Sequence, residues 1–236
     1  MMRLAVPSWV IPGTYLENLS FLKGEGAINA VELLFFLYDR DVQSLLHKEW
    51  EGILELRSRF RFSAHLPEPL LPIHEELVEQ LLPLTEHFIL HPAPPEDAPA
   101  LAALITSWVE RFDRGKQLFL LENTLPERLE TLLGYLPDAV GMCMDTGHLL
   151  LEGKSPEAFY RRFKKRIQEI HLHGIAPEKA RLDGRLPDHR PLCPQEPWFQ
   201  DLLPLLAGFT GTVNLEVFSW EEVLQSLGAL HAVGLL

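Results

Sequence analysis

Short apolar runs alternate with longer amphipathic stretches eight times along the chain. Each short run has the length and the apolar character of a buried strand. The eight runs are Arg3–Trp9, Ala30–Phe36, Phe60–His65, Phe88–His91, Gln117–Glu122, Ala139–Asp145, Ile167–His173 and Thr212–Phe218. The stretches between them place apolar residues on one helix face, most clearly from Leu101 to Phe112.

Helix-start signals support this alternation. An N-cap residue with a first-turn proline, or the spacing of a capping box, occurs at Ser155-Pro156-Glu157, Thr124-x-x-Glu127 and Ser219-x-x-Glu222. Eight strand–helix units without a linker predict a single α/β domain over residues 1–236, a (β/α)8 TIM barrel. An open doubly wound sheet is disfavoured, since Trp9-Val10-Ile11-Pro12-Gly13 follows the first strand in place of a glycine-rich phosphate loop.

The charge balance narrows the range of partners. Against 21 Lys and Arg stand 33 Asp and Glu, a net charge of −12, which disfavours binding to nucleic acid. The basic run Arg161–Arg166 is expected on the solvated face of an outer helix. With no signal peptide, no membrane-spanning run and only two cysteines, we expect a cytoplasmic protein with a small-molecule substrate, and the oligomeric state stays open.

Histidines and carboxylates gather where the strand candidates end. The residues at these ends are His65, His91, Glu122, Asp145, His171, His173 and Glu216, with His148 three residues beyond the sixth strand. In a barrel these ends meet at one mouth, where buried carboxylates repel one another unless cations lie between them. Any one of these residues could be a structural hydrogen-bonding group, but the set favours zinc, manganese, iron or cobalt.

Strand alternation separates residues that point into the barrel from those that point out. Cys143 shares its parity with Asp145 and should lie one layer below it, in the barrel core. His171 and His173 should both point inward at different heights, the lower one nearer a metal ion and the upper one a second ligand or a proton shuttle.

The order of these residues resembles the xylose isomerase-like TIM-barrel superfamily, which includes the family 2 AP endonucleases and sugar isomerases or epimerases. The motifs that carry the resemblance are Ala64-His65, Leu90-His91-Pro92, Leu121-Glu122-Asn123, Asp145-Thr146-Gly147-His148, Ile170-His171-Leu172-His173 and Leu215-Glu216-Val217. For the isomerases the resemblance implies one ion held by four residues, Glu122, Asp145, His171 and Glu216, with the two glutamates as catalytic proton carriers. Those enzymes usually follow the strand-seven histidine with Asp and Arg, whereas this chain has Leu172-His173-Gly174.

The phosphodiesterase branch of the superfamily adds further ligands. The resemblance implies one ion on His65, His91 and Glu122, and a second on Glu122, Asp145, His171 and Glu216. His148 with the pair Asp188-His189 would hold a third ion, although the usual pair is separated by one residue and here the two are adjacent. The cofactors expected are therefore two divalent ions, zinc or manganese, with a third as an open alternative.

The segment from Gly174 to Pro197 contains five prolines and several charged residues. It is expected to be a structureless lid or binding loop, or else a solvated loop without a role. Arg185 and Arg190 in this segment could clamp a phosphate. Glu32 and His173 are the other candidate substrate contacts, Glu32 having a barrel-wall position as its alternative.

A narrower resemblance lies at the N-terminus. Ser8–Asn18 and Val31–Phe36 are similar to bacterial cobamide-remodelling phosphodiesterases of the same superfamily, which cleave the nucleotide loop of a corrinoid. The expected function is a metal-dependent hydrolase that cleaves a phosphodiester of a small metabolite, with a corrinoid as the leading candidate. The alternatives are a metal-dependent sugar or sugar-phosphate isomerase or epimerase, and a metal-binding barrel without catalysis.

Overall fold

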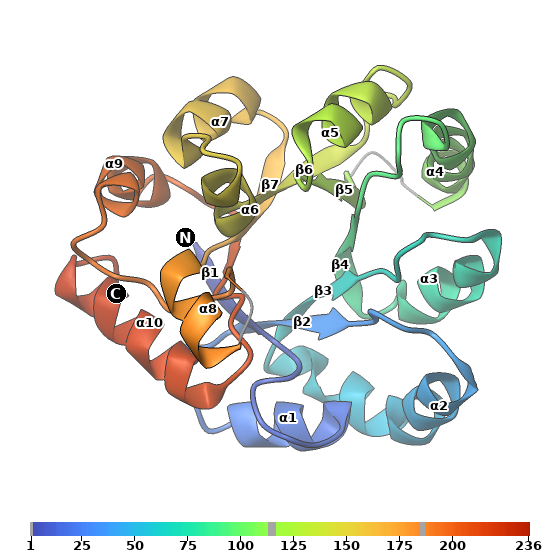
Figure 1. The fold of residues 1–236 in the computed structure, drawn as a ribbon. Helices are drawn as coiled ribbons and strands as arrows, with labels where there is room; N and C mark the ends of the chain where they lie inside the picture. Colours follow the sequence, from blue (N-terminus) through green and yellow to red (C-terminus); the bar gives the residue numbers. More distant parts are fainter. Residues whose placement is uncertain (1, 113–116, 185–186) are drawn as a thin grey trace.

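The computed structural model describes residues 2–112, 117–184 and 187–236. Within these residues the eight strands form a closed parallel barrel in chain order, and the last strand pairs with the first (Figure 1). The strands are β1 Arg3–Pro7, β2 Ala30–Leu34, β3 Arg61–His65, β4 Thr85–Leu90, β5 Phe119–Glu122, β6 Gly141–Asp145, β7 Ile167–His171 and β8 Thr212–Asn214. The prediction of a (β/α)8 barrel is confirmed.

The strand boundaries differ from the prediction mainly at β4 and β8. β4 begins at Thr85, three residues before the predicted start. Glu86, in this added part of the strand, pairs with Arg3 of β1 at 2.6 Å. β8 ends at Asn214, so Glu216 stands two residues beyond the strand. Because β4 begins with polar residues, a search for apolar runs finds only the later part of this strand.

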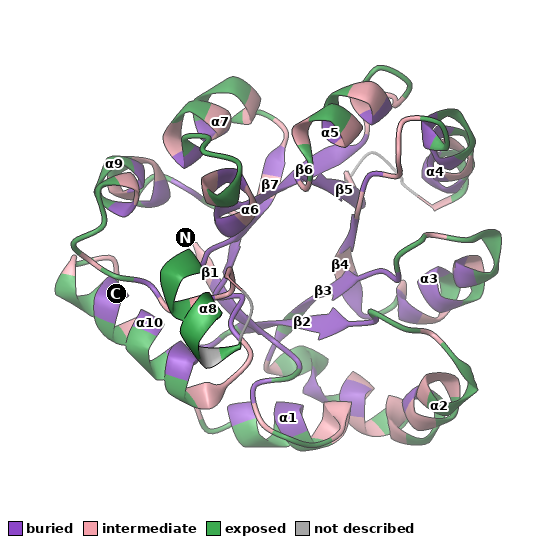
Figure 2. Ribbon diagram, in the orientation of Figure 1, coloured by how far each residue is buried: buried purple, intermediate pink, exposed green. Residues whose placement is uncertain are grey.

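Helices form the outer ring of the barrel. They are α1 Tyr15–Leu22, α2 Arg40–Glu55, α3 Glu75–Leu81, α4 Ala98–Phe112, α5 Pro126–Leu133, α6 Thr146–Leu151, α7 Pro156–Phe163, α8 Pro177–Asp183, α9 Pro197–Leu206 and α10 Trp220–Ala232, with 3-10 turns at Leu56–Ser58 and Pro72–His74. Their exposed sides face outward and the strands are buried (Figure 2). In the part of the chain that the structure describes, no helix has the length and apolar character needed to cross a membrane.

Two of the three predicted helix starts are confirmed. Ser155 caps α7 by accepting the Ala158 N–H, and Ser219 caps α10 by accepting the Glu222 N–H. The third is wrong: α5 begins at Pro126 and Leu125 precedes it without a side-chain cap. Proline has no N–H and suits the first helical position, which moves the start past Thr124.

The basic run lies on α7 and the turn after it, on the outside of the barrel. Arg161 pairs with Glu157 at 2.8 Å and Arg162 with Glu130 at 3.2 Å, both at exposed positions. These arginines are therefore partnered by neighbouring acids, as expected for a solvated face.

A small apolar cluster of Ile89, Leu120 and Cys143 is buried within the barrel. Cys143 is fully buried, and burial raises the pKa of its thiol well above the ordinary value. This confirms Cys143 as a core residue below Asp145. The larger core lies between the strands and the helices, where Leu101, Ile105 and Trp108 of α4 are buried.

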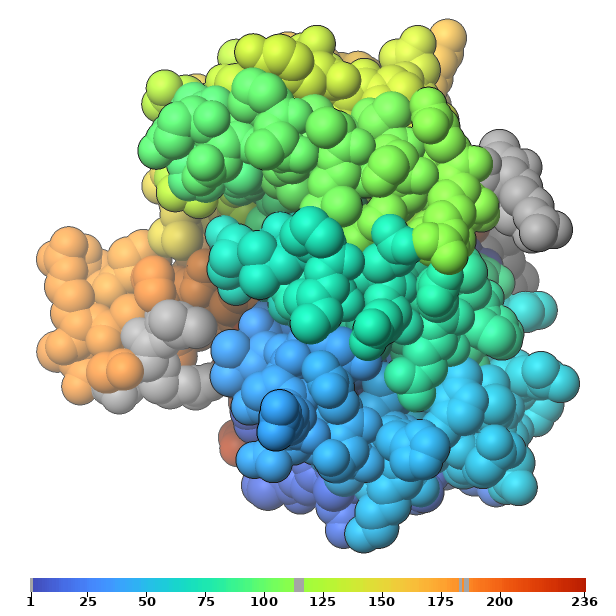
Figure 3. All heavy atoms as spheres, turned by 90° about the vertical axis from the view of Figure 1, so that its right-hand side faces the viewer, coloured from blue at the N-terminus to red at the C-terminus, as the bar shows by residue number. Residues whose placement is uncertain are grey.

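The segment after β7 is more ordered than the sequence suggested. It contains α8, which begins at Pro177 and is followed by Gly184 in the left-handed conformation. Gly174 pairs with Arg190 through two backbone hydrogen bonds. In Figure 3 this segment, drawn in orange, stands out at one end of the barrel. Arg185 lies outside the described residues.

Candidate metal centre

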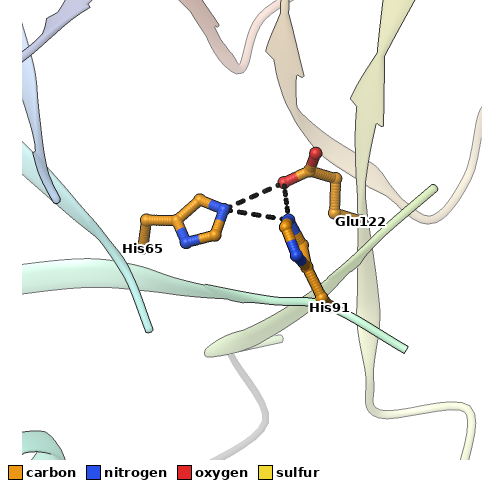
Figure 4. A group of neighbouring side chains, drawn as sticks. All are labelled: His65, His91 and Glu122. Carbon is orange, nitrogen blue, oxygen red and sulfur yellow. Dashed lines mark hydrogen bonds and ion pairs between the residues drawn. The ribbon is translucent and has the colours of Figure 1, made fainter. Parts of the chain in front are cut away.

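Three donor atoms meet beside the ends of β3, β4 and β5 (Figure 4). The Nε2 atoms of His65 and His91 are 3.2 Å apart, and they lie 3.3 and 3.4 Å from Oε2 of Glu122. His65 and Glu122 are buried, and His91 is mostly so. We call this set the first donor group; its two imidazoles and one carboxylate are a donor set that zinc accepts.

Hydrogen bonds on the far side of each ring fix which nitrogen is available. Nδ1 of His65 donates to the Leu66 carbonyl at 3.1 Å, and Nδ1 of His91 donates to Oε2 of Glu68 at 2.7 Å. Each assignment leaves Nε2, which faces Glu122, as the nitrogen that would hold an ion. Glu68 thereby performs the orienting role that carboxylates have beside metal-bound histidines.

A second donor group lies deeper in the mouth and shares Glu122. Nδ1 of His171 lies 3.1 Å from Oε2 of Glu216, 3.5 Å from Oε2 of Glu122 and 4.0 Å from Oδ2 of Asp145. Nε2 of His171 donates to Oε2 of Glu32 at 2.8 Å, so Nδ1 is the nitrogen that would hold an ion. The second donor group is therefore Glu122, Asp145, His171 and Glu216.

The buried atoms of this second donor group fit a cation. Oε2 of Glu122, Nδ1 of His171 and Oε2 of Glu216 are buried and make no hydrogen bond within the described residues. Buried polar atoms normally find partners, because an unmade hydrogen bond is costly. Three such atoms facing one another are satisfied together by a divalent ion.

The third donor group consists of His148 of α6 with Asp188 and His189 of the loop after α8. His148 Nε2 lies 3.9 Å from Oδ2 of Asp188, and His189 Nε2 lies 3.9 Å from Oδ1 of the same carboxylate. Nδ1 of His148 faces the Asn123 carbonyl at 3.1 Å, and Nδ1 of His189 faces the Glu216 carbonyl at 3.2 Å, so both Nε2 atoms are available. His189 has a positive φ of 50°, a conformation that turns adjacent Asp188 and His189 side chains toward the same space.

His173 has the opposite arrangement. The backbone N–H of His189 donates to Nδ1 of His173 at 3.0 Å, closer than the Gly174 carbonyl at 3.3 Å, so Nε2 carries the proton and donates to Oδ2 of Asp145 at 2.9 Å. The ring is fully buried beside Gly147, where an added Cβ would come within 2.0 Å of His173 Cε1. His173 therefore orients Asp145, and it has no exposed surface with which to contact a substrate.

Histidine and carboxylate charges stabilise one another in this centre. Burial alone would lower the pKa of His91, but Glu122 and Glu68 raise it to about 10. Burial acts in the same direction on His148, where Asp145 and Glu122 raise the pKa to about 10. Glu122 itself is kept well below its ordinary pKa by His91 and His171, although burial opposes this. An ion entering the centre therefore displaces protons.

The structure brings all nine predicted metal ligands together and redirects several predicted substrate contacts. Glu32 is fully buried on β2 and holds His171, so it lies in the barrel wall and away from the open mouth. Arg190 is also buried, at 4% exposure, with its backbone paired to Gly174. Its role as a phosphate clamp stays a prediction.

Two supporting residues were missed by the sequence reasoning. Glu68 lies in the loop after β3, where no strand parity predicts its contact with His91. Asn123 follows Glu122 and clamps the backbone of Asp145 through two hydrogen bonds of 2.8 and 2.9 Å. A polar residue directly after a strand-end ligand is the signal that could have found Asn123.

Comparisons with known proteins agree with this barrel. No protein-family model matches the chain. A stretch of 63 residues, 27% of the chain, is 36% identical to an inosose dehydratase of Lacticaseibacillus casei, and the chain spans only 20% of that protein's length.

Three solved structures are similar over almost the whole chain. A D-tagatose 3-epimerase-like protein has a TM-score of 0.72 at 18% identity. The alignment covers 98% of this chain and 96% of that protein. An AP endonuclease, family 2, from Brucella melitensis has a TM-score of 0.67 at 14% identity, covering 98% and 99%. The IOLI protein with a bound zinc atom has a TM-score of 0.66 at 14% identity, covering 98% of each chain. The fold is thus a (β/α)8 barrel like that of these three proteins, as the order of the sequence motifs led us to expect.

Proposed function

We propose that this protein is a metal-dependent hydrolase that cleaves a phosphodiester in a small metabolite. One observation carries the proposal: Oε2 of Glu122 lies within 3.5 Å of imidazole nitrogens of His65, His91 and His171. Glu122 is therefore common to the first and second donor groups. A carboxylate shared by two ions is a feature of centres that hydrolyse phosphate esters.

The donor groups divide the work of holding the ions. His65, His91 and Glu122 would hold one ion, and Glu122, Asp145, His171 and Glu216 a second. His148, Asp188 and His189 offer a third position. Bound divalent ions would supply Lewis acidity and lower the pKa of water at the centre. Zinc is the ion that the paired imidazoles of the first and third donor groups favour, and the three carboxylates of the second donor group make manganese the alternative.

The residues of the chain contribute orientation and proton handling. Glu68 and Glu32 hold the rings of His91 and His171, so the donor nitrogens face inward before a substrate arrives. Glu216 places its buried Oε2 3.1 Å from Nδ1 of His171, and we assign to Glu216 a role in passing protons during the reaction. Glu122 and Glu216 are the catalytic residues of this proposal.

A small metabolite suits the charge of the molecule better than nucleic acid does. The net charge is −12, and the basic residues of α7 lie on the outside and pair with acids. A corrinoid remains the leading substrate, on the N-terminal resemblance alone.

A second candidate is a metal-dependent sugar or sugar-phosphate isomerase or epimerase. The similarity to a D-tagatose 3-epimerase-like protein and to an inosose dehydratase favours it. The second donor group suffices for one ion, and Glu122 and Glu216 would then move the protons. The first and third donor groups have no part in such a reaction, which is why the geometry favours the hydrolase.

Metal analysis combined with two assays separates these candidates. The hydrolase predicts at least two ions per chain by elemental analysis, and cleavage of bis(4-nitrophenyl) phosphate that His65→Ala reduces strongly. One ion per chain, no ester cleavage, and deuterium incorporation from D2O into a ketose would establish the isomerase and overturn the hydrolase.

A further inference from the structure

A cavity lies beside the ends of β1 and β2. It has a volume of about 260 Å³ and lies between the loops that follow β1 and β2. Its lining includes no charged side chain, and its principal walls are Trp9, Tyr15, Leu34, Phe36, Leu37 and Val42. Trp9, Phe36 and Leu37 are 57%, 41% and 70% exposed, which is unusual for large apolar residues.

The polar groups in the wall of this cavity are engaged within the protein. The Leu34 N–H donates to Oγ of Ser8 at 3.1 Å, and the Tyr15 hydroxyl donates to the Leu34 carbonyl at 2.9 Å. The Thr14 hydroxyl accepts the Glu17 N–H as the cap of α1. The wall therefore offers apolar and aromatic faces, which suit stacking and burial of an uncharged ring.

Phe36 connects this cavity to the metal centre. Its ring centroid lies 5.5 Å from that of His65 in the first donor group, and 6.3 Å from that of Phe218. Phe218 in turn lies 4.8 Å from His189 of the third donor group. The cavity and the donor groups are thus separated by one aromatic side chain.

We infer that this cavity is an aromatic subsite that binds an uncharged aromatic or heteroaromatic group of the substrate. The inference deepens the proposed function, since that group would belong to the molecule whose phosphodiester lies at the donor groups. The occupant is argued from three facts: the absence of charge in the lining, the exposed aromatic walls, and the contact between Phe36 and His65. A sugar without a ring of this kind would leave these apolar faces in water.

Equilibrium binding tests the subsite without any reaction. Saturation-transfer NMR on the EDTA-treated full chain, with adenosine as the probe and methyl riboside as the ring-free control, should show transfer to the base protons only. Trp9→Ala should weaken adenosine binding about tenfold through the loss of stacking. Tyr135→Ala, which removes another exposed aromatic residue, should leave binding unchanged. Equal binding by Trp9→Ala and the parent protein, or no transfer from the parent, would overturn the subsite.

A second variant distinguishes weaker binding from loss of folding. Leu37→Asp changes a side chain that is 70% exposed, so the fold should persist while the added charge prevents ring binding. Its thermal unfolding should match that of the parent, and its adenosine affinity should match that of Trp9→Ala. Parent-like affinity in this folded variant would contradict the inference.

Kinetics link the subsite to the proposed reaction. Bis(4-nitrophenyl) phosphate and ethyl 4-nitrophenyl phosphate share a leaving group and differ in the retained group, which is aromatic only in the first. Trp9→Ala should raise KM for the first ester about tenfold and leave KM for the second unchanged. An equal effect on both esters would overturn the subsite. If the parent cleaves neither ester while adenosine still binds, the proposed hydrolysis fails and the subsite stands.

Discussion

The two sides of the barrel mouth carry different chemistry on the same scaffold. The ends of β3 to β8 and the loops that follow them supply the nine histidines and carboxylates of the three donor groups, five of them buried and four partly buried. The loops after β1 and β2 supply exposed apolar side chains around an uncharged cavity. Glu32 of β2 belongs to the side of the donor groups only through its hydrogen bond with His171. In a barrel, therefore, reaction and recognition can be assigned to separate strand ends that meet at one mouth.

The largest effect that would test this division is expected at Glu122. Glu122→Gln removes the charge that the first and second donor groups share, so phosphodiester turnover should fall at least about a thousandfold. Elemental analysis should show fewer ions per chain. Glu127→Gln, at an exposed position of α5, is the control and should retain both turnover and ions. Unchanged turnover in a folded Glu122→Gln protein would remove the shared role of this residue.

The side of the mouth that carries the donor groups is closely packed, whereas the side that carries the aromatic cavity is open. A substitution at Gly147 tests this close packing. Gly147→Ala would bring a Cβ within 2.0 Å of His173 Cε1, which must displace the ring that orients Asp145. Overpacking of this kind should lower the free energy of unfolding by about 1–3 kcal/mol. Gly228→Ala in α10 meets nothing within 4 Å and should not destabilise the protein. Denaturant unfolding compares the two variants, and equal stability would show that the ring has room to move.

Glu68 tests whether the exposed edge of the donor side also organises the centre. Its side chain is 51% exposed, yet it accepts from Nδ1 of His91 at 2.7 Å, and that bond lowers its own pKa. Glu68→Gln should weaken ion binding about 10- to 100-fold, as loss of such a partner does in other metal sites. Zinc titration against a chromophoric chelator measures this. Glu55→Gln, exposed on α2, is the matched control. Parent-like zinc affinity in Glu68→Gln would show that His91 needs no partner.

The barrel and the convergence of the nine candidate ligands could be predicted from the sequence, because both depend on local periodicity and on where strands end. That these residues hold ions stays a prediction. Strand parity correctly placed Cys143 below Asp145, and His171 and His173 inside the barrel. Parity could not distinguish the roles of the two histidines, because the roles depend on which nitrogen receives a hydrogen bond. For His173 that bond comes from the N–H of His189, sixteen residues further along the chain.

The missing parts have a common physical cause. Glu68 and α8 lie in loops, where side-chain direction follows from tertiary contacts and has no period to read. Glu32 appeared to be a substrate contact because its strand ends at the mouth. All of β2 is buried, and Glu32 faces the His171 ring inside the barrel, which is the barrel-wall position that the sequence left as its alternative.

The smallest expected effect contrasts two histidines of neighbouring loops. Burial lowers the pKa of His74, whose Nδ1 accepts the Leu71 N–H at 3.2 Å, whereas carboxylates raise the pKa of His91. Below about pH 6.5 the unfolded chain therefore binds a proton at His74 that the folded chain resists, so stability contributed by neutral His74 is present above that pH and is lost as the pH falls. Between pH 7.5 and 5.5, His74→Asn should reduce the pH-dependent loss of unfolding free energy by less than about 1 kcal/mol. Urea denaturation at both pH values measures this, with exposed His47→Asn as the control. An equal change in both variants would show that the environment of His74 does not differ from that of a surface histidine.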